Sequence, residues 1–434
     1  MNIMMGCPEE TGLHLEIKGE SQMKLVKFDG FPFVEGGVTA AKGFSASGVH
    51  CGIRANKSKK DLGLLLADHD CAAAGVYTLN KVKGAPIAVT KDHIAGGCCR
   101  GVIVNSGIAN TCNADGVEKA EAMCQIAAKA VHLKETNFAV ASTGVIGQPL
   151  PLEPIQGSID TLVKELSPKN HGDFASAIMT TDTVMKETAV EFTLGGKTCH
   201  IGGCAKGSGM IMPNMATMLC FLTTDAAVSP EMLRLVLKQV VDETFNMVSV
   251  DGDTSTNDTV LLLASGDAGN PEIVCQNEQY EVFANALYAV LMNLSRMIAG
   301  DGEGATKLLE CTVDGAQTKE QAKIVAKSVI NSSLLKAAMF GADANWGRVL
   351  CAIGYAETDV DIGRVDVAFA SENGAIAVCQ NGAGIDFSEE TAKKVLSADE
   401  IKILIDLNAG EKSATAWGCD LTYDYVRING DYPS

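Results

Sequence analysis

The sequence predicts an α+β protein, built as a layered sandwich of sheets and helices. Helical segments and hairpin-linked strands follow one another in irregular order, without the strict strand-helix-strand alternation of a doubly wound sheet. The chain has 434 residues, of which 47% are hydrophobic and 20% charged. At about 100 to 200 residues per unit, this length predicts two or three structural units around a sizeable core.

In the first half, the segment 117–133 is rich in Ala, Glu and Lys and predicts a helix. The apolar run 138–141 predicts a buried strand. Apolar and polar residues alternate over 190–194, and Gly195-Gly196 separates this run from 198–201. This pattern is typical of a tight hairpin.

The second half begins with a helix that has Ser229 as its N-cap and Pro230 at its first position. Further helices are expected over 281–298, 319–330 and 389–396. Alternating isoleucines at 401–407 predict a strand. A long half-exposed strand is predicted over 417–425, with Trp417, Cys419, Leu421, Tyr423 and Tyr425 on one face and Asp420, Thr422 and Asp424 on the other.

Charge and hydropathy exclude two classes of partner. The chain carries 35 Lys and Arg against 53 Asp and Glu, a formal net charge of -18, which is the wrong sign for binding a nucleic-acid backbone. The longest apolar runs, such as 259–264, fall far short of the ~18 residues that a membrane span needs. We therefore expect neither nucleic acid nor membrane as a partner.

The 15 cysteines lie among apolar neighbours, as at Cys71, Cys220 and Cys351, and no CxxC occurs. Such a distribution is typical of small buried thiols in a reducing compartment. Residues 1–34 lack the basic and apolar regions of a targeting peptide and are expected to form a poorly ordered leader. A cytoplasmic protein is predicted.

Common ligand-binding and metal-binding motifs are not found. All seven histidines lie in the first 200 residues, and no HExxH or Cys/His finger occurs, so no metal site is expected. Gly300–Lys307 lacks P-loop spacing and carries two acidic residues, and Gly207–Met212 lacks the third glycine of a dinucleotide fingerprint. A nucleotide-binding domain is therefore not expected.

The segment Lys206–Phe221 contains an Ala216-Thr217 junction between a predicted hairpin and an apolar strand. A threonine hydroxyl in a constrained turn can attack the preceding carbonyl, and hydrolysis of the resulting ester leaves Thr217 as a new N-terminus. Its α-amine, with a pKa of about 7.7–8.0, then suits a general base at neutral pH. The alternative is that Thr217 only begins a buried strand, and the local sequence by itself favours that alternative.

The sequence Met212-Pro213-Asn214-Met215-Ala216-Thr217-Met218-Leu219 resembles the self-cleavage site of the ornithine acetyltransferase family of arginine biosynthesis, also called glutamate N-acetyltransferase. The likeness runs from about residue 35 to the C-terminus. Further matching blocks, in the same order, are Gly37–Ala40, Lys42–Phe44, Asn105–Gly107, Ser142–Gly147, Met179–Thr183, Gly300–Lys307 and Asp343–Arg348.

This resemblance implies that the precursor cleaves itself between Ala216 and Thr217 into an α-chain, 35–216, and a β-chain, 217–434, which form the sandwich jointly. It implies an α2β2 heterotetramer. The implied reaction moves an acetyl group from N2-acetylornithine to glutamate by a ping-pong cycle through acetyl-Thr217. No metal or redox cofactor is implied, and whether acetyl-CoA also serves as donor is left open.

The resemblance also assigns roles to residues outside the cleavage site. Thr143 and Gly144 match the oxyanion hole of the family, where a hydroxyl and a backbone N–H stabilise a tetrahedral oxyanion. The positions that match its substrate contacts are Thr180, Lys206, Thr217, Glu303, Asn429 and Ser434. Charge is consistent with these roles, since Lys206 suits the α-carboxylate of the substrates and Glu303 suits an ammonium group.

Two other functions are compatible with parts of this pattern. A self-cleaving aminopeptidase or amidase would form the same acyl-enzyme and discharge it to water, and the combined match of Thr180, Lys206 and Glu303 favours the transferase. A non-enzymatic protein that kept only the fold is disfavoured by the intact Thr143, Gly144, Lys206 and Thr217.

Overall fold

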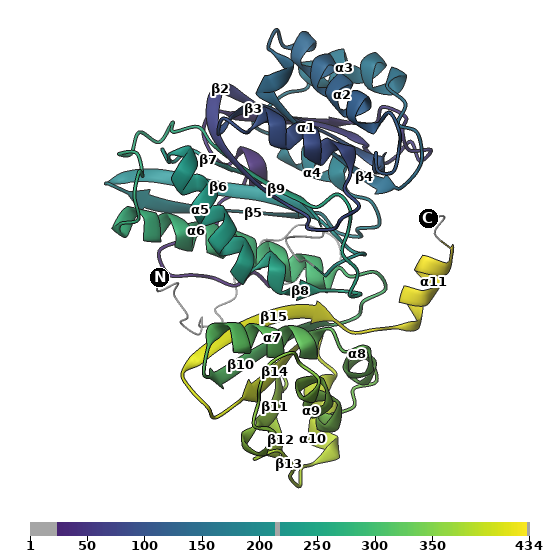
Figure 1. Cartoon of the computed structure of the whole chain (residues 1–434), viewed down its shortest axis with the longest axis vertical. Helices are drawn as coiled ribbons and strands as arrows, with labels where there is room; N and C mark the ends of the chain where they lie inside the picture. Colours follow the sequence, from purple (N-terminus) through teal and green to yellow (C-terminus); the bar gives the residue numbers. More distant parts are fainter. Residues whose placement is uncertain (1–23, 213–217, 432–434) are drawn as a thin grey trace.

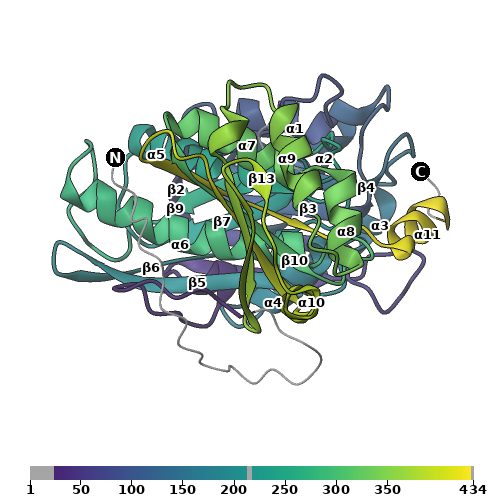
Figure 2. The same ribbon diagram turned by 90° about the horizontal axis from the view of Figure 1, so that it is seen from below.

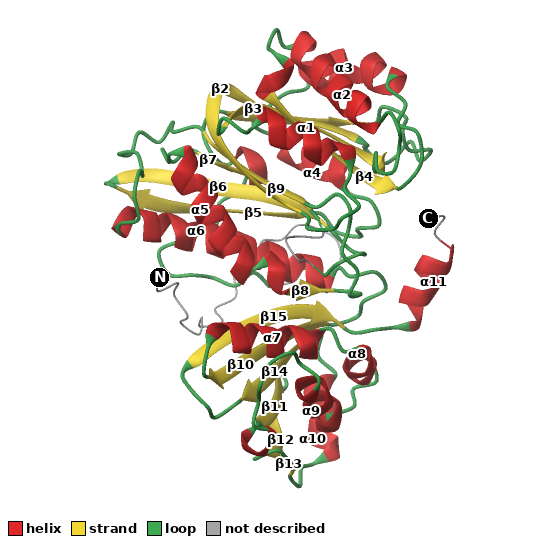
Figure 3. Ribbon diagram, viewed as in Figure 1, coloured by secondary structure: helices red, strands yellow, loops and turns green. Residues whose placement is uncertain are grey.

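The computed structural model describes residues 24–212 and 218–431. Within them the chain forms two sheets with helices on their faces (Figures 1 and 3). The first sheet runs in the order β4 (Phe138–Val145), β3 (Cys98–Ile108), β2 (Leu62–Tyr77), β9 (Thr259–Ala264), β7 (Leu219–Thr224), β6 (Lys197–Lys206) and β5 (Lys186–Leu194), with β1 (Phe44–Val49) paired to β2.

The second sheet lies wholly in the second half of the chain. Its order is β13 (Ala383–Gly384), β12 (Gly374–Gln380), β11 (Asp366–Ser371), β14 (Glu400–Asp406), β10 (Leu308–Ala316), β15 (Lys412–Cys419) and β8 (Val248–Ser249). Most strand pairs in both sheets are antiparallel, whereas β3–β4, β7–β9, β10–β14 and β15–β8 are parallel. The mixed α+β class is thus confirmed.

The helices are α1 (Ala85–His93), α2 (Gly116–Ala130), α3 (Glu153–Lys164), α4 (His171–Ile178), α5 (Pro230–Glu243), α6 (Glu278–Gly300), α7 (Lys319–Ile330), α8 (Ser333–Phe340), α9 (Trp346–Gly354), α10 (Glu389–Leu396) and α11 (Tyr423–Asp431). Helix α6 packs against β5 and β6 on one side and against β15, β10 and β8 on the other (Figure 1). It is the layer that joins the two sheets.

By length and composition alone, α6 is apolar enough to cross a membrane, but 78% of its most apolar window is buried inside the protein. This burial is what a helix between two sheets requires, because both of its faces must be apolar. The run-length argument from the sequence did not detect α6, since polar residues interrupt its apolar stretches. Within the described residues, α6 is therefore best understood as a core helix.

Several predicted helices and strands are confirmed, together with the cap and turn residues that predicted them. Helix α5 begins at Pro230, and the Ser229 hydroxyl accepts a hydrogen bond from the Met232 N–H at 3.4 Å. The predicted hairpin is β5–β6, in which Leu194 pairs with Lys197 across Gly195 and Gly196. Both glycines have positive φ, 55° and 77°, as a tight turn between twisted strands demands. The helix predicted over 117–133 is α2, and those over 281–298, 319–330 and 389–396 are α6, α7 and α10.

The long strand predicted over 417–425 is wrong in its second half. Strand β15 ends at Cys419, and α11 begins at Tyr423. Asp420 is buried rather than exposed, because its carboxylate accepts hydrogen bonds from the backbone N–H groups of Thr306 and Lys307 at 2.8 and 3.0 Å. This long-range contact ends the strand, and α11 then lies at the margin of the molecule (Figure 2).

The expected leader covered residues 1–34, of which 1–23 lie outside the described residues. Residues 24–34 belong to the fold. The Val26 N–H donates to the Asn293 side chain at 2.8 Å, and the Val34 N–H donates to the Ala189 carbonyl at 3.0 Å. A leader therefore cannot extend as far as residue 34.

The cysteine prediction is correct for most of the described cysteines, all of which are free thiols. Cys71 and Cys220 are buried, as expected. Cys351 is exposed, which corrects the prediction there, because α9 turns this position toward solvent while Val349, Ala352 and Ile353 face the core.

Candidate active site

The predicted cleavage residues Ala216 and Thr217, together with Ser434, lie outside the described residues. The strand that follows the predicted cleavage point, β7, is held between two neighbours in the sheet. Leu219 pairs with Lys206 of β6 on one side and with Thr259 of β9 on the other. The Thr259 N–H donates to the Met218 carbonyl at 2.9 Å. The end of β6 and the start of β9 therefore flank the start of β7.

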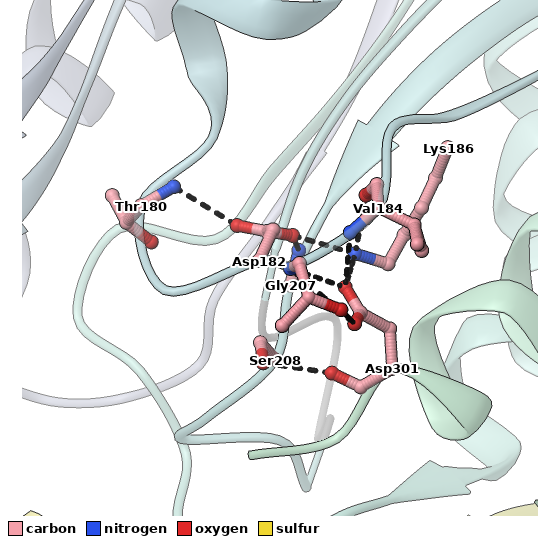
Figure 4. A network of polar contacts seen from close by, with 8 residues as sticks. Thr180, Asp182, Val184, Lys186, Gly207, Ser208 and Asp301 are labelled. Atoms are coloured by element: carbon pink, nitrogen blue, oxygen red, sulfur yellow. Dashed lines mark hydrogen bonds and ion pairs between the residues drawn. The ribbon is translucent and has the colours of Figure 1, made fainter. Parts of the chain in front are cut away.

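A buried ion network lies beside the end of β6 (Figure 4). The Lys186 ammonium group donates to a carboxylate oxygen of Asp182 at 2.7 Å and to one of Asp301 at 2.5 Å. All three side chains are buried. Because a buried charge is tolerated only when it is paired, these groups must stay together in the folded protein.

This network fixes the backbone next to two predicted substrate residues. The Asp182 carboxylate accepts hydrogen bonds from the Thr180 N–H at 2.9 Å and from the Gly207 N–H at 2.7 Å. Arg54 holds the other side of the first peptide, because its guanidinium donates to the Met179 carbonyl at 2.8 Å, and it also donates to the Thr180 carbonyl at 3.1 Å. Thr180 and Lys206, which are distant in sequence, are thus brought to one place.

Lys206 makes no ion pair within 4.0 Å with any described residue. Burial lowers the pKa of its ammonium group, while the nearby carboxylates of Asp182, Asp258 and Glu303 act in the opposite direction. The Lys206 ammonium group is partly desolvated and makes no direct ion pair with a described residue, so it is suited to bind an anionic group of a ligand.

Asp258 immediately precedes β9 and is only 1% exposed. Burial raises the pKa of its carboxyl group well above its usual range, and the Ser255 hydroxyl and the Lys206 ammonium group offset only part of this effect. Neither carboxyl oxygen has a hydrogen bond of normal geometry within the described part of the chain. Asp258 is therefore a buried carboxyl group with a raised pKa, close to the start of β7.

Glu303 lies in the loop that follows α6. Its backbone N–H donates to the Ser208 carbonyl at 2.9 Å, and its carboxylate accepts a hydrogen bond from the Asn429 side chain at 2.8 Å. A Cβ at Gly209 would stand 2.5 Å from this carboxylate, so a larger residue there would push the Glu303 side chain aside. The structure thus brings Glu303 and Asn429 together, next to the segment that follows Lys206.

Thr143 and Gly144 lie near the end of β4, where Thr143 is buried. Gly144 has φ +129°, a conformation that side chains rarely adopt. A Cβ at this position would stand 2.2 Å from the carbonyl carbon of Gly107 on β3. The close approach of the β3 and β4 backbones therefore requires glycine here.

The sequence interpretation gave no role to several charged or polar groups of this region, among them Asp182 and Arg54. Lys186 and Asp301 were given no role, and neither were Asn257 and Asp258. One signal was available for the last two: the polar run from Thr254 to Asp258 directly precedes the apolar run that forms β9. No local sequence pattern predicts the pairing of Lys186 with Asp301, because these residues are 115 positions apart.

Comparison with known proteins shows which family this chain resembles. The model of the ArgJ family matches residues 45–434. The arginine biosynthesis bifunctional protein ArgJ 1 of Clostridium acetobutylicum is 48% identical over 398 residues, covering 92% of this chain and 97% of the relative. The ArgJ protein of Symbiobacterium thermophilum is 50% identical over 402 residues, covering 92% and 99%.

Among solved structures, an ornithine acetyltransferase from Mycobacterium tuberculosis in complex with ornithine is 36% identical and matches 43% of this chain and 100% of its own, with a TM-score of 0.40. The match to the family model includes every described residue of the candidate site. The chain belongs to the ArgJ family and is an enzyme of arginine biosynthesis.

Proposed function

We propose that this enzyme transfers the acetyl group of N2-acetylornithine to glutamate, giving ornithine and N-acetylglutamate, with Thr217 as the nucleophile. The observation that carries this proposal is the convergence at the start of β7. Lys206 and Asp258 flank that point, and the network around Lys186 and Asp182 holds Thr180 beside it. A site for an amino-acid substrate would therefore lie directly beside the proposed nucleophile.

The proposed chemistry has two matched halves. The Thr217 hydroxyl oxygen bonds to the acetyl carbon, the amide C–N bond breaks, and the hydroxyl proton passes through the Thr217 α-amine to the leaving nitrogen of ornithine. The amine nitrogen of glutamate then bonds to the acetyl carbon and the ester C–O bond breaks. The proton lost by that amine passes through the Thr217 α-amine to the Thr217 oxygen and restores the hydroxyl. An α-amine with a pKa of about 7.7–8.0 can accept and return a proton near neutral pH.

Thr143 and Gly144 would supply the donors for the oxyanion that forms in each half. The backbone of Thr143 and Gly144 is fixed by the pairing of β4 with β3, so the Gly144 N–H would not need to reorganise during the reaction. Removing one such donor typically costs about 3–4 kcal/mol of transition-state stabilisation.

Substrate selection would follow charge. Both N2-acetylornithine and glutamate carry an α-carboxylate, which Lys206 would pair. The free δ-ammonium of N2-acetylornithine would face Glu303, with Asn429 orienting that carboxylate through its 2.8 Å hydrogen bond. Ser434 and the Thr217 backbone would complete the substrate contacts.

The same proposal includes self-processing. Cleavage between Ala216 and Thr217 would give segments 35–216 and 217–434 that stay associated, as an α2β2 assembly in the cytoplasm. The buried ion pair of Lys186 with Asp301 and the hydrogen bond from the Glu303 N–H to the Ser208 carbonyl would link the two segments after cleavage.

The test is product analysis with purified enzyme. We expect N2-acetylornithine and glutamate together to yield ornithine and N-acetylglutamate. An aminopeptidase or amidase would instead release free acetate at the same rate with or without glutamate, and that result would overturn the transferase. The relatives are named bifunctional. If the enzyme also forms N-acetylglutamate from acetyl-CoA and glutamate, its second activity is acetyl transfer with acetyl-CoA as the donor.

A further inference from the structure

Asn257 is a buried side chain whose amide group uses its full hydrogen-bonding capacity. It lies in the loop between β8 and β9, two residues before Thr259, and is 7% exposed. Its amide makes four hydrogen bonds of 2.9 Å or less to protein atoms. A carboxamide has two N–H donors and two acceptor sites, so each of them is occupied.

The two donors reach the ends of β3 and β4. The Asn257 Nδ2 group donates to the Ala109 carbonyl at 2.6 Å and to the Ser142 carbonyl at 2.9 Å. The Ser142 carbonyl belongs to the peptide that joins this residue to Thr143. Asn257 therefore orients the peptide plane immediately before Thr143 and Gly144.

The orientation of the amide is determined by its partners. Carbonyl oxygens only accept, so Ala109 and Ser142 must face the NH2 end. At the other end, the Oδ1 atom accepts hydrogen bonds from the hydroxyls of Thr111 at 2.6 Å and Thr256 at 2.5 Å. A reversed amide would place its oxygen against the two carbonyl oxygens and lose both hydrogen bonds at that end.

The backbone on the other side of Asn257 is tied to the start of β7. The Asp258 carbonyl accepts a hydrogen bond from the Thr78 N–H at 3.0 Å, and the Thr259 N–H donates to the Met218 carbonyl at 2.9 Å. Residues 109 and 142 precede the proposed cleavage point, and residue 257 follows it. The Asn257 side chain thus links the Thr143–Gly144 segment of β4 to the strand beside the proposed nucleophile.

We propose that Asn257 is a positioning residue for acetyl transfer, which holds the Thr143–Gly144 segment of β4 in register with the start of β7. It touches neither the substrate nor the reacting atoms. Its effect is geometric, because oxyanion donors stabilise the transition state only at hydrogen-bonding distance from the developing charge. This inference rests on the proposed oxyanion role of Thr143 and Gly144.

The test compares Asn257→Asp with wild type and with Asn270→Asp. Asn270 is a matched control, since it is 6% exposed, also makes side-chain hydrogen bonds to backbone groups, and lies beyond the other end of β9. The cleaved fraction is measured on a denaturing gel and used to express kcat per cleaved molecule. KM is measured for both substrates. Thermal unfolding reports the stability of each variant.

In Asn257→Asp the introduced carboxylate faces two carbonyl oxygens and has no proton to donate. We expect kcat to fall on the order of 10- to 100-fold, with KM for both substrates within about 2-fold of wild type. Protonation of the new carboxyl restores one donor, so the ratio of wild-type to variant kcat should shrink as the pH falls. Asn270→Asp should lose stability but keep kcat within about 2-fold.

The inference is overturned if Asn257→Asp keeps kcat, or if it loses no more than Asn270→Asp and shows no pH-dependent recovery. Thr143→Ala distinguishes the oxyanion role of Thr143 from the positioning role of Asn257. If kcat falls in Thr143→Ala but not in Asn257→Asp, the oxyanion role stands and only the role of Asn257 fails. If Asn257→Asp does not fold or cleave, Thr111→Val decides, because it removes one of the two hydroxyls that orient the amide. A smaller loss of kcat is then expected, and an unchanged kcat overturns the inference.

Discussion

The Lys186 ammonium nitrogen lies 2.5 Å from a carboxylate oxygen of Asp301, and both side chains are buried. Lys186 precedes the proposed cleavage point, whereas Asp301 follows it. The pair would therefore be a noncovalent link between the two segments of the processed enzyme. It also anchors Asp182, which holds the backbone at Thr180 and Gly207.

Breaking this pair should destabilise the protein strongly. In Lys186→Met the carboxylates of Asp182 and Asp301 lose their buried cation, and we expect the free energy of unfolding to fall by about 3–5 kcal/mol. Lys319→Met is the matched control, because Lys319 pairs with Glu243 at 2.7 Å but is 40% exposed. Its loss should stay within about 1 kcal/mol. Urea denaturation measures both, and equal losses would contradict this account of the network.

Gly144→Ala should damage both stability and catalysis. The new Cβ would stand 2.2 Å from the Gly107 carbonyl carbon, and alanine strongly disfavours φ +129°. Gly147 also has positive φ, 79°, but nothing lies within 4 Å of its Cβ position. Gly147→Ala should therefore cost only the backbone strain, about 1–2 kcal/mol. Gly144→Ala should cost more than Gly147→Ala in thermal unfolding, and it should lower kcat for acetyl transfer.

The pH dependence of substrate binding should report on Lys206. Because burial lowers the pKa of this ammonium group, it loses its charge at a lower pH than an ordinary lysine, whose pKa is about 10.4. The KM for glutamate should therefore rise on the alkaline side before that pH is reached. Lys206→Arg keeps its charge throughout and should show a KM that is higher overall but lacks the alkaline rise caused by loss of charge at residue 206. A KM that varies equally with pH in both proteins would exclude Lys206 as the titrating group.

The lowered pKa of Lys206 also determines how its contribution to the free energy of unfolding changes with pH. The folded state releases its proton from Lys206 at a lower pH than the unfolded chain, so between the two pKa values the unfolded state binds more protons. The contribution of Lys206 to the free energy of unfolding should thus become more favourable as the pH rises through this window. Comparing wild type with Lys206→Met by urea denaturation across the alkaline range measures this contribution.

Glu303→Gln should discriminate between the two substrates. The amide keeps a hydrogen bond to Asn429 within reach but removes the negative charge proposed to face the δ-ammonium of N2-acetylornithine. A lost charge-assisted contact of about 1.5–3 kcal/mol corresponds to a fall of roughly 10- to 100-fold in kcat/KM. The fall should be seen with N2-acetylornithine as donor, whereas the KM for glutamate should change little. Steady-state kinetics with each substrate varied in turn provides the measurement, and equal effects on both would contradict the assignment.

Elements with local signals could be predicted from the sequence. The Ser229-Pro230 start of α5 and the Gly195-Gly196 turn between β5 and β6 depend on neighbouring residues only, and both are confirmed. The end of β15 could not be predicted, because Asp420 is drawn inward by the N–H groups of Thr306 and Lys307, more than 100 residues away.

The candidate site shows the same division. Family blocks in the sequence marked Thr143, Gly144, Thr180, Lys206 and Glu303, and the structure places Thr180, Lys206 and Glu303 near one another through shared partners. The groups that hold them were not marked with any role. Lys186 lies on a strand and Asn257 in a loop, and their partners come from distant segments, so no spacing or periodicity in the sequence reveals their contacts.

The central claim is that Thr217, freed by self-cleavage, carries the acetyl group. The most direct measurement is mass spectrometry of the purified enzyme after exposure to N2-acetylornithine without glutamate, with the modified residue located by fragmentation. The account predicts a fragment that begins at Thr217 and carries one acetyl group on that residue, and the acetyl group is lost when glutamate is added. A chain that remains uncleaved while active, or an acetyl group on a different residue, would contradict it.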